Sequence, residues 1–204
     1  MTVKYFYLMA LLAVPMPAAA GALSDLLLAP DVFAAAPVGT AVAYSEERTV
    51  PGEGSLGDVT DGRVRLEVET GEDGPTLLLV RGAEGKEGPV GSFSPRVANP
   101  VLLYFLETTV RAMAEATGGS PYYIRNRMRE ALAAADLGPE GPTRAVTLRP
   151  FAADANRVRM GEFADLTIRL SFDPGEPGRI LELSADTPGD GSGYHETLVL
   201  LAEE

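Results

Sequence analysis

The chain has 204 residues and is acidic, with 29 aspartates and glutamates against 17 lysines and arginines and a formal charge of −12. It contains one histidine, His195, and no cysteine, which excludes disulfide scaffolds, thiolate zinc sites, iron–sulfur clusters, cysteine nucleophiles and multi-histidine metal sites. The negative charge argues against nucleic acid as a partner, because neutralising phosphates requires clustered lysine and arginine. The composition therefore predicts an acidic globular protein without a metal or another cofactor.

The N-terminus has the order of a secretory signal peptide. Lys4 precedes an apolar stretch over residues 5–14, and small residues follow up to cleavage sites after Ala20 or Ala22. The apolar stretch is much shorter than the roughly 20 residues of a membrane-spanning helix, so we do not expect an integral membrane protein. The alternative is an uncleaved N-terminal helix. An amino-acid composition with almost no lysine is typical of a GC-rich bacterial genome. We expect a signal peptide over residues 1–20, or to residue 22, and a single periplasmic domain over residues 23–204.

Alternating polar and apolar residues predict strands in the first half of the chain. The clearest case is residues 63–70, where Val64, Leu66 and Val68 face one way and charged residues face the other. Residues 40–50 and 76–82 also have strand character, and glycine-rich turns separate the segments. The first of these turns contains Gly52, Gly54 and Gly57 with dinucleotide-site spacing, but a strand follows it instead of a helix. We therefore interpret that turn as a hairpin loop.

Two helices follow, each beginning with a cap residue and a proline. Asn99 and Pro100 begin the first helix, and Ser120 and Pro121 begin the second. Spacings of three and four predict buried residues at Leu103, Leu106, Val110 and Met113 in the first helix and at Ile124, Met128, Leu132 and Ala135 in the second. Because the connection is short, we expect an antiparallel helical hairpin.

After the helices the period of two returns. Residues 144–149, 166–172, 179–185 and 194–201 are expected strands, joined by turns of glycine, proline and aspartate. Strands, then helices, then strands predict an α+β fold. We expect an antiparallel, curved sheet of about six or seven strands wrapped on a central two-helix hairpin.

His195 is where an enzyme hypothesis begins, because histidine titrates near neutral pH. Ser192 and Glu196 are close to it in sequence, but residues 195 and 196 of a strand point to opposite faces, and no G-x-S-x-G nucleophile elbow is present. The acidic residues of the loop 186–193 do not have the spacing of a calcium-binding EF-hand. A structural histidine is the preferred interpretation, and a hydrolase site at His195 is the alternative.

The second helix is rich in basic and aromatic side chains, although the chain as a whole is acidic. These residues are Tyr122, Tyr123, Arg125, Arg127 and Arg129. Arg125 and Arg129 share one helical face, where like charges repel unless an anion lies between them. Glu107, Glu115 and Glu130 can supply that negative charge, which is the first interpretation. The second is a surface that binds an anion or a partner, because arginine and tyrosine are enriched at interfaces.

A signal peptide, an antiparallel sheet on helices and no catalytic constellation together resemble the periplasmic lipid and lipoprotein carriers of the LolA/LppX type. The resemblance is architectural and covers most of the mature chain in outline, but the helical pair is central in this sequence. A hydrophobic cargo in such a fold needs a space between sheet and helices, with candidate lining residues Leu66, Val68, Leu106, Met113 and Met128. Packing of an ordinary core explains the same residues.

Three hypotheses follow from the sequence. The first is an exported, non-enzymatic periplasmic protein that binds a hydrophobic ligand, such as a lipid, or an envelope protein. The second is a periplasmic hydrolase with a site near His195. The third is a purely structural envelope protein.

Overall fold

The structure, a computed structural model, describes residue 23 and residues 33–202, except for residues 53, 84, 97, 138, 177 and 190–192. The described strands are β1 (Ala41–Thr49), β2 (Val59–Gly71), β3 (Gly74–Ala83), β4 (Lys86–Phe93), β5 (Arg144–Leu148), β6 (Thr167–Phe172), β7 (Ile180–Asp186) and β8 (His195–Leu200). The helices α2 (Pro100–Thr117) and α3 (Pro121–Ala133) stand between β4 and β5, and the short 3-10 helices η1 (Arg157–Arg159) and η2 (Gly161–Asp165) between β5 and β6. The predicted signal peptide lies outside the described residues.

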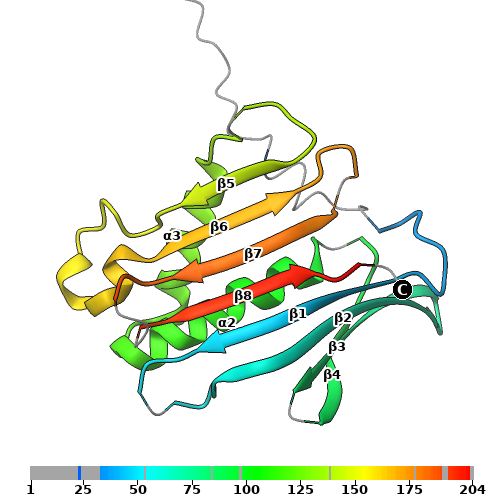
Figure 1. Ribbon diagram of the computed structural model, residues 1–204, viewed down its shortest axis with the longest axis horizontal. Coiled ribbons are helices and arrows are strands. Elements are labelled where there is room, and N and C mark those ends of the chain that lie inside the picture. The colour runs from blue at the N-terminus through cyan, green and yellow to red at the C-terminus, as the bar shows by residue number, and fades with distance from the viewer. Residues whose placement is uncertain are drawn as a thin grey trace, which may run out of the picture.

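The strands form one sheet in the order β4-β3-β2-β1-β8-β7-β6-β5 (Figure 1). Every neighbouring pair is antiparallel. The first and last strands pair at the centre of the sheet, where Glu46 lies opposite Leu198. The two halves of the chain are thus joined through β1 and β8, and the predicted α+β class with an antiparallel sheet is confirmed.

The sheet has eight strands, against the six or seven expected, because β4 has no clear alternation of polar and apolar residues. This strand contains Gly88, Pro89 and Gly91, and its register shifts beside Pro89. Proline and a register shift are typical of an edge strand, where one side of the backbone has no neighbouring strand. Such a strand cannot be recognised from hydrophobic periodicity.

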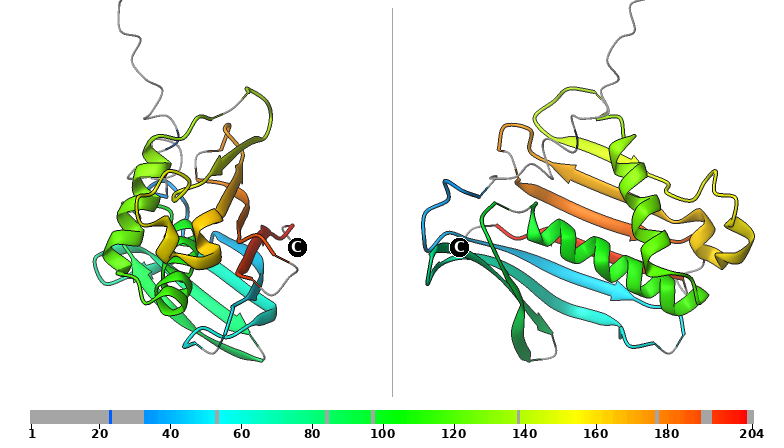
Figure 2. Two further views of the ribbon diagram at one scale, coloured as in Figure 1. Left: turned by 90° about the vertical axis from the view of Figure 1, so that its left-hand side faces the viewer. Right: turned by 180° about the vertical axis from the view of Figure 1, so that it is seen from behind.

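The helices α2 and α3 cover the same face of the sheet, which we call the inner face, and neither of them lies on the opposite outer face (Figure 2). In the figures α2 runs along the central strands β1 and β8, whereas α3 crosses behind β5, β6 and β7. The helices meet at the short turn between Thr117 and Pro121 and diverge from it, so they form a V more than a closely packed hairpin. Among the described residues, no helix is both long enough and apolar enough to cross a bilayer.

The start of α2 is fixed by the predicted cap. Asn99 Oδ1 accepts a hydrogen bond from Val101 N at 2.9 Å, and Asn99 Nδ2 donates to Gly178 O at 2.8 Å. The helix ends at Gly118 with φ of 65°, a left-handed conformation that favours glycine. The predicted cap of α3 is wrong in one respect, because the Ser120 side chain makes no capping hydrogen bond. Asn99 therefore does more than cap, since it also ties α2 to the loop between β6 and β7.

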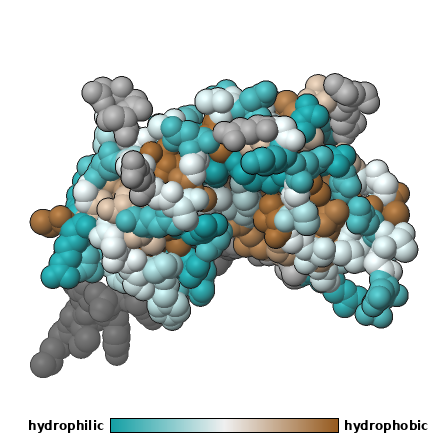
Figure 3. Space-filling view, turned by 90° about the horizontal axis from the view of Figure 1, so that it is seen from below, coloured by the Kyte–Doolittle hydropathy of each residue, from teal (hydrophilic) through white to brown (hydrophobic). Residues whose placement is uncertain are grey.

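The buried side of α2 differs from the predicted one at its first turns. Leu102 and Phe105 are fully buried, whereas Leu103 is 38% exposed and Leu106 is only partly buried. The other helix residues predicted to be buried are buried in full or in part: Val110, Met113, Ile124, Met128, Leu132 and Ala135. Residues 101–106 are apolar on almost every side, so periodicity could not define one face. On the side of the molecule seen in Figure 3, hydrophobic residues appear in several patches separated by hydrophilic ones.

Candidate functional site

A pocket of about 460 Å³ lies at the end of β8, between β1 on one side and the loop that leads into β7 on the other. The pairing of β8 with β1 reaches Leu200, but its pairing with β7 reaches only Val199. Tyr44 bridges β1 and β7, because its hydroxyl donates to Ile180 O at 3.1 Å. We call this the end pocket, and its lining residues are Phe33, Thr40–Tyr44, Arg63, Glu176, Gly178, Arg179 and Leu200–Ala202.

The end pocket combines apolar and cationic groups. Phe33, Val42 and Leu200 are half-buried and pack against the hydrophobic core. Arg179 forms an ion pair with Glu176 at 2.7 Å, whereas the exposed Arg63 forms no ion pair among the described residues. Burial raises the pKa of the Tyr44 hydroxyl, and the positive charge of Arg179 opposes that rise. The guanidinium group of Arg179 therefore lies close to the hydroxyl of Tyr44, beside the apolar side chains of the pocket.

A second group of polar side chains is buried between α2 and the inner face. We call it the buried charge cluster: Glu46, Arg48, Arg81, Tyr104, Thr108, Tyr194 and Glu196. Arg48 Nη1 lies 3.0 Å from Glu46 Oε1 and 3.3 Å from Glu196 Oε1, and Arg81 Nε lies 2.6 Å from Glu46 Oε2. The Tyr104 hydroxyl donates to Glu46 at 2.8 Å, and the Tyr194 hydroxyl donates to Glu196 at 2.5 Å. Charges of both signs are thus paired inside the molecule.

The strand geometry explains how the cluster is built. Tyr44, Glu46 and Arg48 alternate along β1 and face inward, and the register places Arg48 opposite Glu196 of β8. Tyr104 and Thr108 are four residues apart on α2, so they lie on one side of that helix. Thr108 Oγ1 lies 2.6 Å from Glu196 Oε2. The cluster consequently connects α2 to both central strands through polar contacts.

Burial dominates the protonation behaviour of the cluster. It raises the pKa of Glu196 to about 6, against hydrogen bonds from Thr108 and Tyr194 and the charge of Arg48, which lower it. Burial also raises the pKa of Tyr104, and the negative charge of Glu46 adds to that rise. Burial lowers the pKa of Arg48, but Glu196 and Glu46 raise it by more, so Arg48 stays charged. Glu46, Arg48 and Glu196 are almost inaccessible to solvent, which suits fastening of α2 more than chemistry on a substrate.

The basic and aromatic residues of α3 divide into paired and unpaired side chains. Arg125 forms an ion pair with Glu107 of α2 at 2.6 Å, and Arg127 pairs with Glu130 and with the buried Asp154. Arg129 is exposed and forms no ion pair in the described part of the chain. In addition, the Tyr123 hydroxyl donates to Asp154 at 2.8 Å, while Tyr122 is 73% exposed. Glu115 is not part of this group, because it accepts hydrogen bonds from Ser55 in the loop between β1 and β2.

Most of the candidate ligand-lining residues belong to the core. Leu66, Val68, Met113 and Met128 are buried in one hydrophobic cluster, and Leu106 packs partly buried against it. None of the five lines the end pocket. The end pocket is therefore lined by residues that the sequence did not single out.

His195 lies on the outer face and Glu196 on the inner face, as strand geometry requires. Thr197 Oγ1 lies 3.0 Å from His195 Nε2, and His195 Nδ1 lies 2.6 Å from Asp186 Oδ1 on the neighbouring strand. A hydroxyl, an imidazole and a carboxylate in this order are also the groups of a Ser-His-Asp hydrolase. Ser192 lies outside the described residues. Among the described residues, no group of three acidic or histidine side chains is arranged to hold a metal ion.

The sequence contained a weak signal for the buried charge cluster. Glu46 and Arg48 have opposite charges and share one strand face with Tyr44, which indicates an ion pair beside an aromatic side chain. No comparable signal marked the end pocket, because it is formed by parts of β1, β2 and β8 and by the loop that leads into β7.

Comparison with known proteins assigns this chain to no family. No family model matches the sequence, and the search of curated proteins finds no significant match. Among solved structures, the lipoprotein LppX of Mycobacterium tuberculosis is similar in overall fold, with 14% sequence identity and a TM-score of 0.37 over 91% of this chain and 95% of that chain.

Proposed function

We propose that this protein is an exported, non-enzymatic binding protein whose ligand is an amphipathic molecule with an apolar chain and an anionic head. The observation that carries the proposal is the end pocket, which joins an apolar wall to two arginines. Its volume of about 460 Å³ falls within the usual range for sites of small molecules.

The apolar wall supports an apolar ligand chain. Phe33, Val42 and Leu200 are partly accessible while they pack against the core, so a chain in the pocket extends an existing apolar contact surface. Covering such side chains removes apolar area from water, at about 25 cal/mol for each Å². The gain is larger for an acyl chain than for a compact polar molecule.

The two arginines support an anionic head. The chain carries a charge of −12, so a dissolved anion is repelled by most of its surface and attracted only where cations gather. Arg63 has no carboxylate partner among the described residues, and Arg179 pairs with the exposed Glu176. A guanidinium group binds carboxylates and phosphates through paired hydrogen bonds.

Export to the periplasm is part of the proposal, and the order of charged, apolar and small residues at the N-terminus supports it. Native mass spectrometry of the protein purified from the periplasm of its own cells tests this part. A chain that starts after Ala20 or Ala22 and carries a small anionic amphiphile agrees with the proposal. An intact Met1 contradicts cleavage, and absence of the protein from the periplasm contradicts export.

Ligand binding is tested by filling the pocket. Ala43 lines the end pocket, so we expect Ala43→Trp to abolish the fluorescence increase that dansyl-undecanoic acid shows with the wild type. Ala145→Trp is the matched control, because Ala145 is an exposed alanine of the edge strand β5 and does not line the pocket. The uncharged methyl ester of the probe should bind about tenfold more weakly, since it lacks the charge that the arginines recognise. Equal binding by Ala43→Trp and wild type contradicts the proposal.

A further inference from the structure

We propose that the outer face carries a second binding site, for a phosphate group, in a hollow lined by Arg149, Arg157 and Arg169. We call it the arginine hollow, and it has a volume of about 590 Å³. Asp165, Thr167 and Asp186 also line it. The site is separate from the end pocket, because β7 begins beside the end pocket at Ile180 and ends at the hollow with Asp186.

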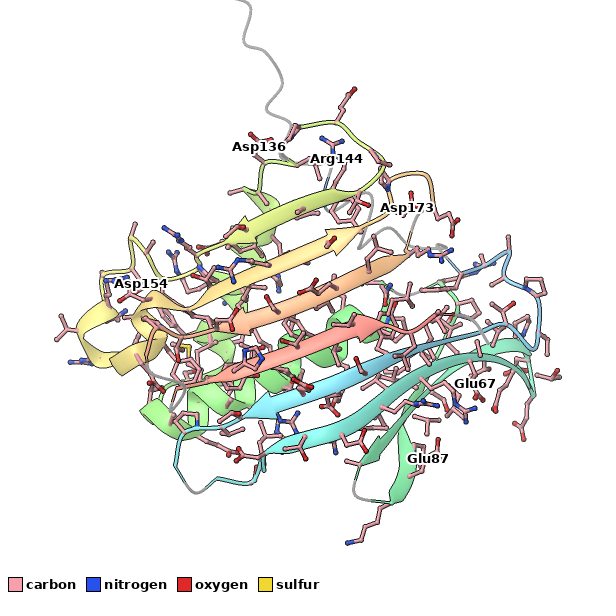
Figure 4. The ribbon with its side chains drawn as sticks, in the orientation of Figure 1. Glu67, Glu87, Asp136, Arg144, Asp154 and Asp173 are labelled. Atoms are coloured by element: carbon pink, nitrogen blue, oxygen red, sulfur yellow. The ribbon has the colours of Figure 1, made fainter. Side chains whose placement is uncertain are left out.

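The sheet register brings the three arginines together. Leu148 pairs with Ile168 in an antiparallel register. Arg149 follows Leu148 in the chain and therefore lies beside Thr167. Arg169 follows two residues later on β6, on the same outer face as Thr167. Arg157 comes from η1, above the start of β6. Figure 4 shows nitrogen-bearing side chains close to one another over this end of β5 and β6, near the labelled Asp154.

Two of the arginines are held in place. Arg157 Nη1 donates to Ala164 O at 2.5 Å, and its guanidinium also pairs with Asp165. Arg169 Nη1 lies 3.1 Å from Asp186 Oδ2. Side chains that are already fixed lose little conformational freedom when a ligand arrives.

The third arginine supplies charge that nothing in the hollow cancels. Arg149 is exposed and forms no ion pair in the part of the chain that the structure describes. The lining holds three arginines against two aspartates, so it is positive within an acidic protein. The carboxylates of Asp165 and Asp186 repel an anion, but each is engaged by an arginine, which leaves Arg149 to attract the ligand.

The donor geometry favours a phosphate group over a carboxylate. A carboxylate has one pair of oxygens and is satisfied by a single guanidinium fork. Several forks that converge from different elements match an anion with oxygens in several directions, and arginine is the residue most used for phosphate recognition. The hydroxyl of Thr167 is a further donor in the lining.

The test uses inorganic phosphate as the probe, measured by isothermal titration calorimetry on the full-length mature protein. We expect the wild type to bind phosphate and Arg149→Gln to bind it about tenfold more weakly or not at all, since hydrogen bonds to charged groups are the strong ones. Arg129→Gln is the matched control, because Arg129 is another exposed arginine without a described ion pair and lies on α3. Both positions are exposed, so an unchanged thermal denaturation midpoint should show that folding is intact.

A vesicle arm distinguishes a free phosphate from a lipid headgroup. Phosphatidylcholine vesicles with and without phosphatidic acid are sedimented with the wild type and with Arg149→Gln. Binding that requires both phosphatidic acid and Arg149 assigns the phosphate to a lipid, whereas Arg149-dependent binding of inorganic phosphate alone assigns it to a soluble ligand. The proposal is overturned if neither arm shows binding, or if Arg149→Gln behaves as the wild type in both. The end-pocket assay is independent of either outcome.

Discussion

The two faces of the sheet carry similar charged side chains in opposite surroundings. On the inner face, the side chains of Glu46 and Glu196 are fully buried and that of Arg48 is 4% exposed. On the outer face, Arg169 and Asp186 form an ion pair at 3.1 Å, but their side chains are 58% and 34% exposed. α2 covers the inner face along β1 and β8, the strands that carry Glu46, Arg48 and Glu196 (Figures 1 and 2).

Burial decides which of these ion pairs the fold depends on. Taking charges out of water costs several kcal/mol for each ion, so a buried charge that loses its partner is strongly destabilising. An exposed pair keeps most of its hydration and contributes about 0 to 1 kcal/mol. We therefore expect the inner face to determine stability, and the outer face to tolerate substitutions that test binding.

The largest effect is expected for Arg48→Met. This change leaves Glu196 without its only ion-pair partner in the described part of the chain and removes one partner of Glu46, so we expect a loss of about 3 to 5 kcal/mol in the free energy of unfolding. Urea denaturation measures it. Arg65→Met is the matched control, because Arg65 is a half-exposed arginine that pairs with Glu67 on the outer face, and a loss below about 1 kcal/mol is expected there.

The double variant Arg48→Met with Glu196→Leu keeps this comparison testable even if the single variant fails to fold. It removes both charges of one pair and replaces them with apolar groups, so it should recover part of the lost stability. Glu46 retains Arg81 as a partner in the double variant. Equal destabilisation by Arg48→Met and Arg65→Met would falsify the contrast between the faces.

A smaller effect is expected from the protonation of Glu196. Its pKa rises from 4.5 to about 6 on folding, so the folded state binds this proton more tightly than the unfolded state. Binding of this proton stabilises the folded state fully below about pH 4.5, and the stabilisation is lost as the pH rises through about 6. The free energy of unfolding should therefore fall by ~2 kcal/mol between pH 4.5 and 7.

The measurement is the free energy of unfolding of wild type minus that of Glu196→Gln across this pH range. The difference should decrease as the pH rises. Glu182→Gln, at an exposed glutamate of β7, provides the control and should run parallel to the wild type. A flat difference for Glu196→Gln means that Glu196 is not buried as the structure describes.

The sequence predicted the elements whose pattern is local. Residues 63–70 alternate cleanly and form part of β2, and Asn99 caps α2 as its position before a proline indicates. The strand β4 was missed because glycine and proline replace the apolar residues that define a period of two. The buried side of α2 was shifted because apolar residues surround its first turns, and packing against the sheet decides which of them is covered.

The candidate site was less predictable, because its parts are distant in sequence. Arg48 and Glu196 meet only through the pairing of β1 with β8. Both faces of β1 carry charges, so its composition does not reveal which face is buried. The end pocket depends on where three strands stop pairing, and no residue type marks such a place. By contrast, the ion pair of Arg127 with Glu130 joins residues three apart on one helix, a spacing that the sequence shows directly, whereas Arg125 meets Glu107 only because the two helices are neighbours.

The smallest effect is expected one residue away from the buried charge cluster. His195 is 45% exposed on the outer face, so His195→Ala should change the free energy of unfolding by less than about 0.5 kcal/mol. The preceding residue, Tyr194, is buried and its hydroxyl donates to Glu196, so Tyr194→Phe should cost about 1 to 3 kcal/mol. Urea denaturation compares the two neighbours directly.

The same His195→Ala protein addresses the hydrolase alternative, because His195 lies between Thr197 and Asp186. We expect wild type and His195→Ala to be indistinguishable in ester and phosphate-ester hydrolysis assays, and an activity that only the wild type shows would favour an enzyme over a binding protein.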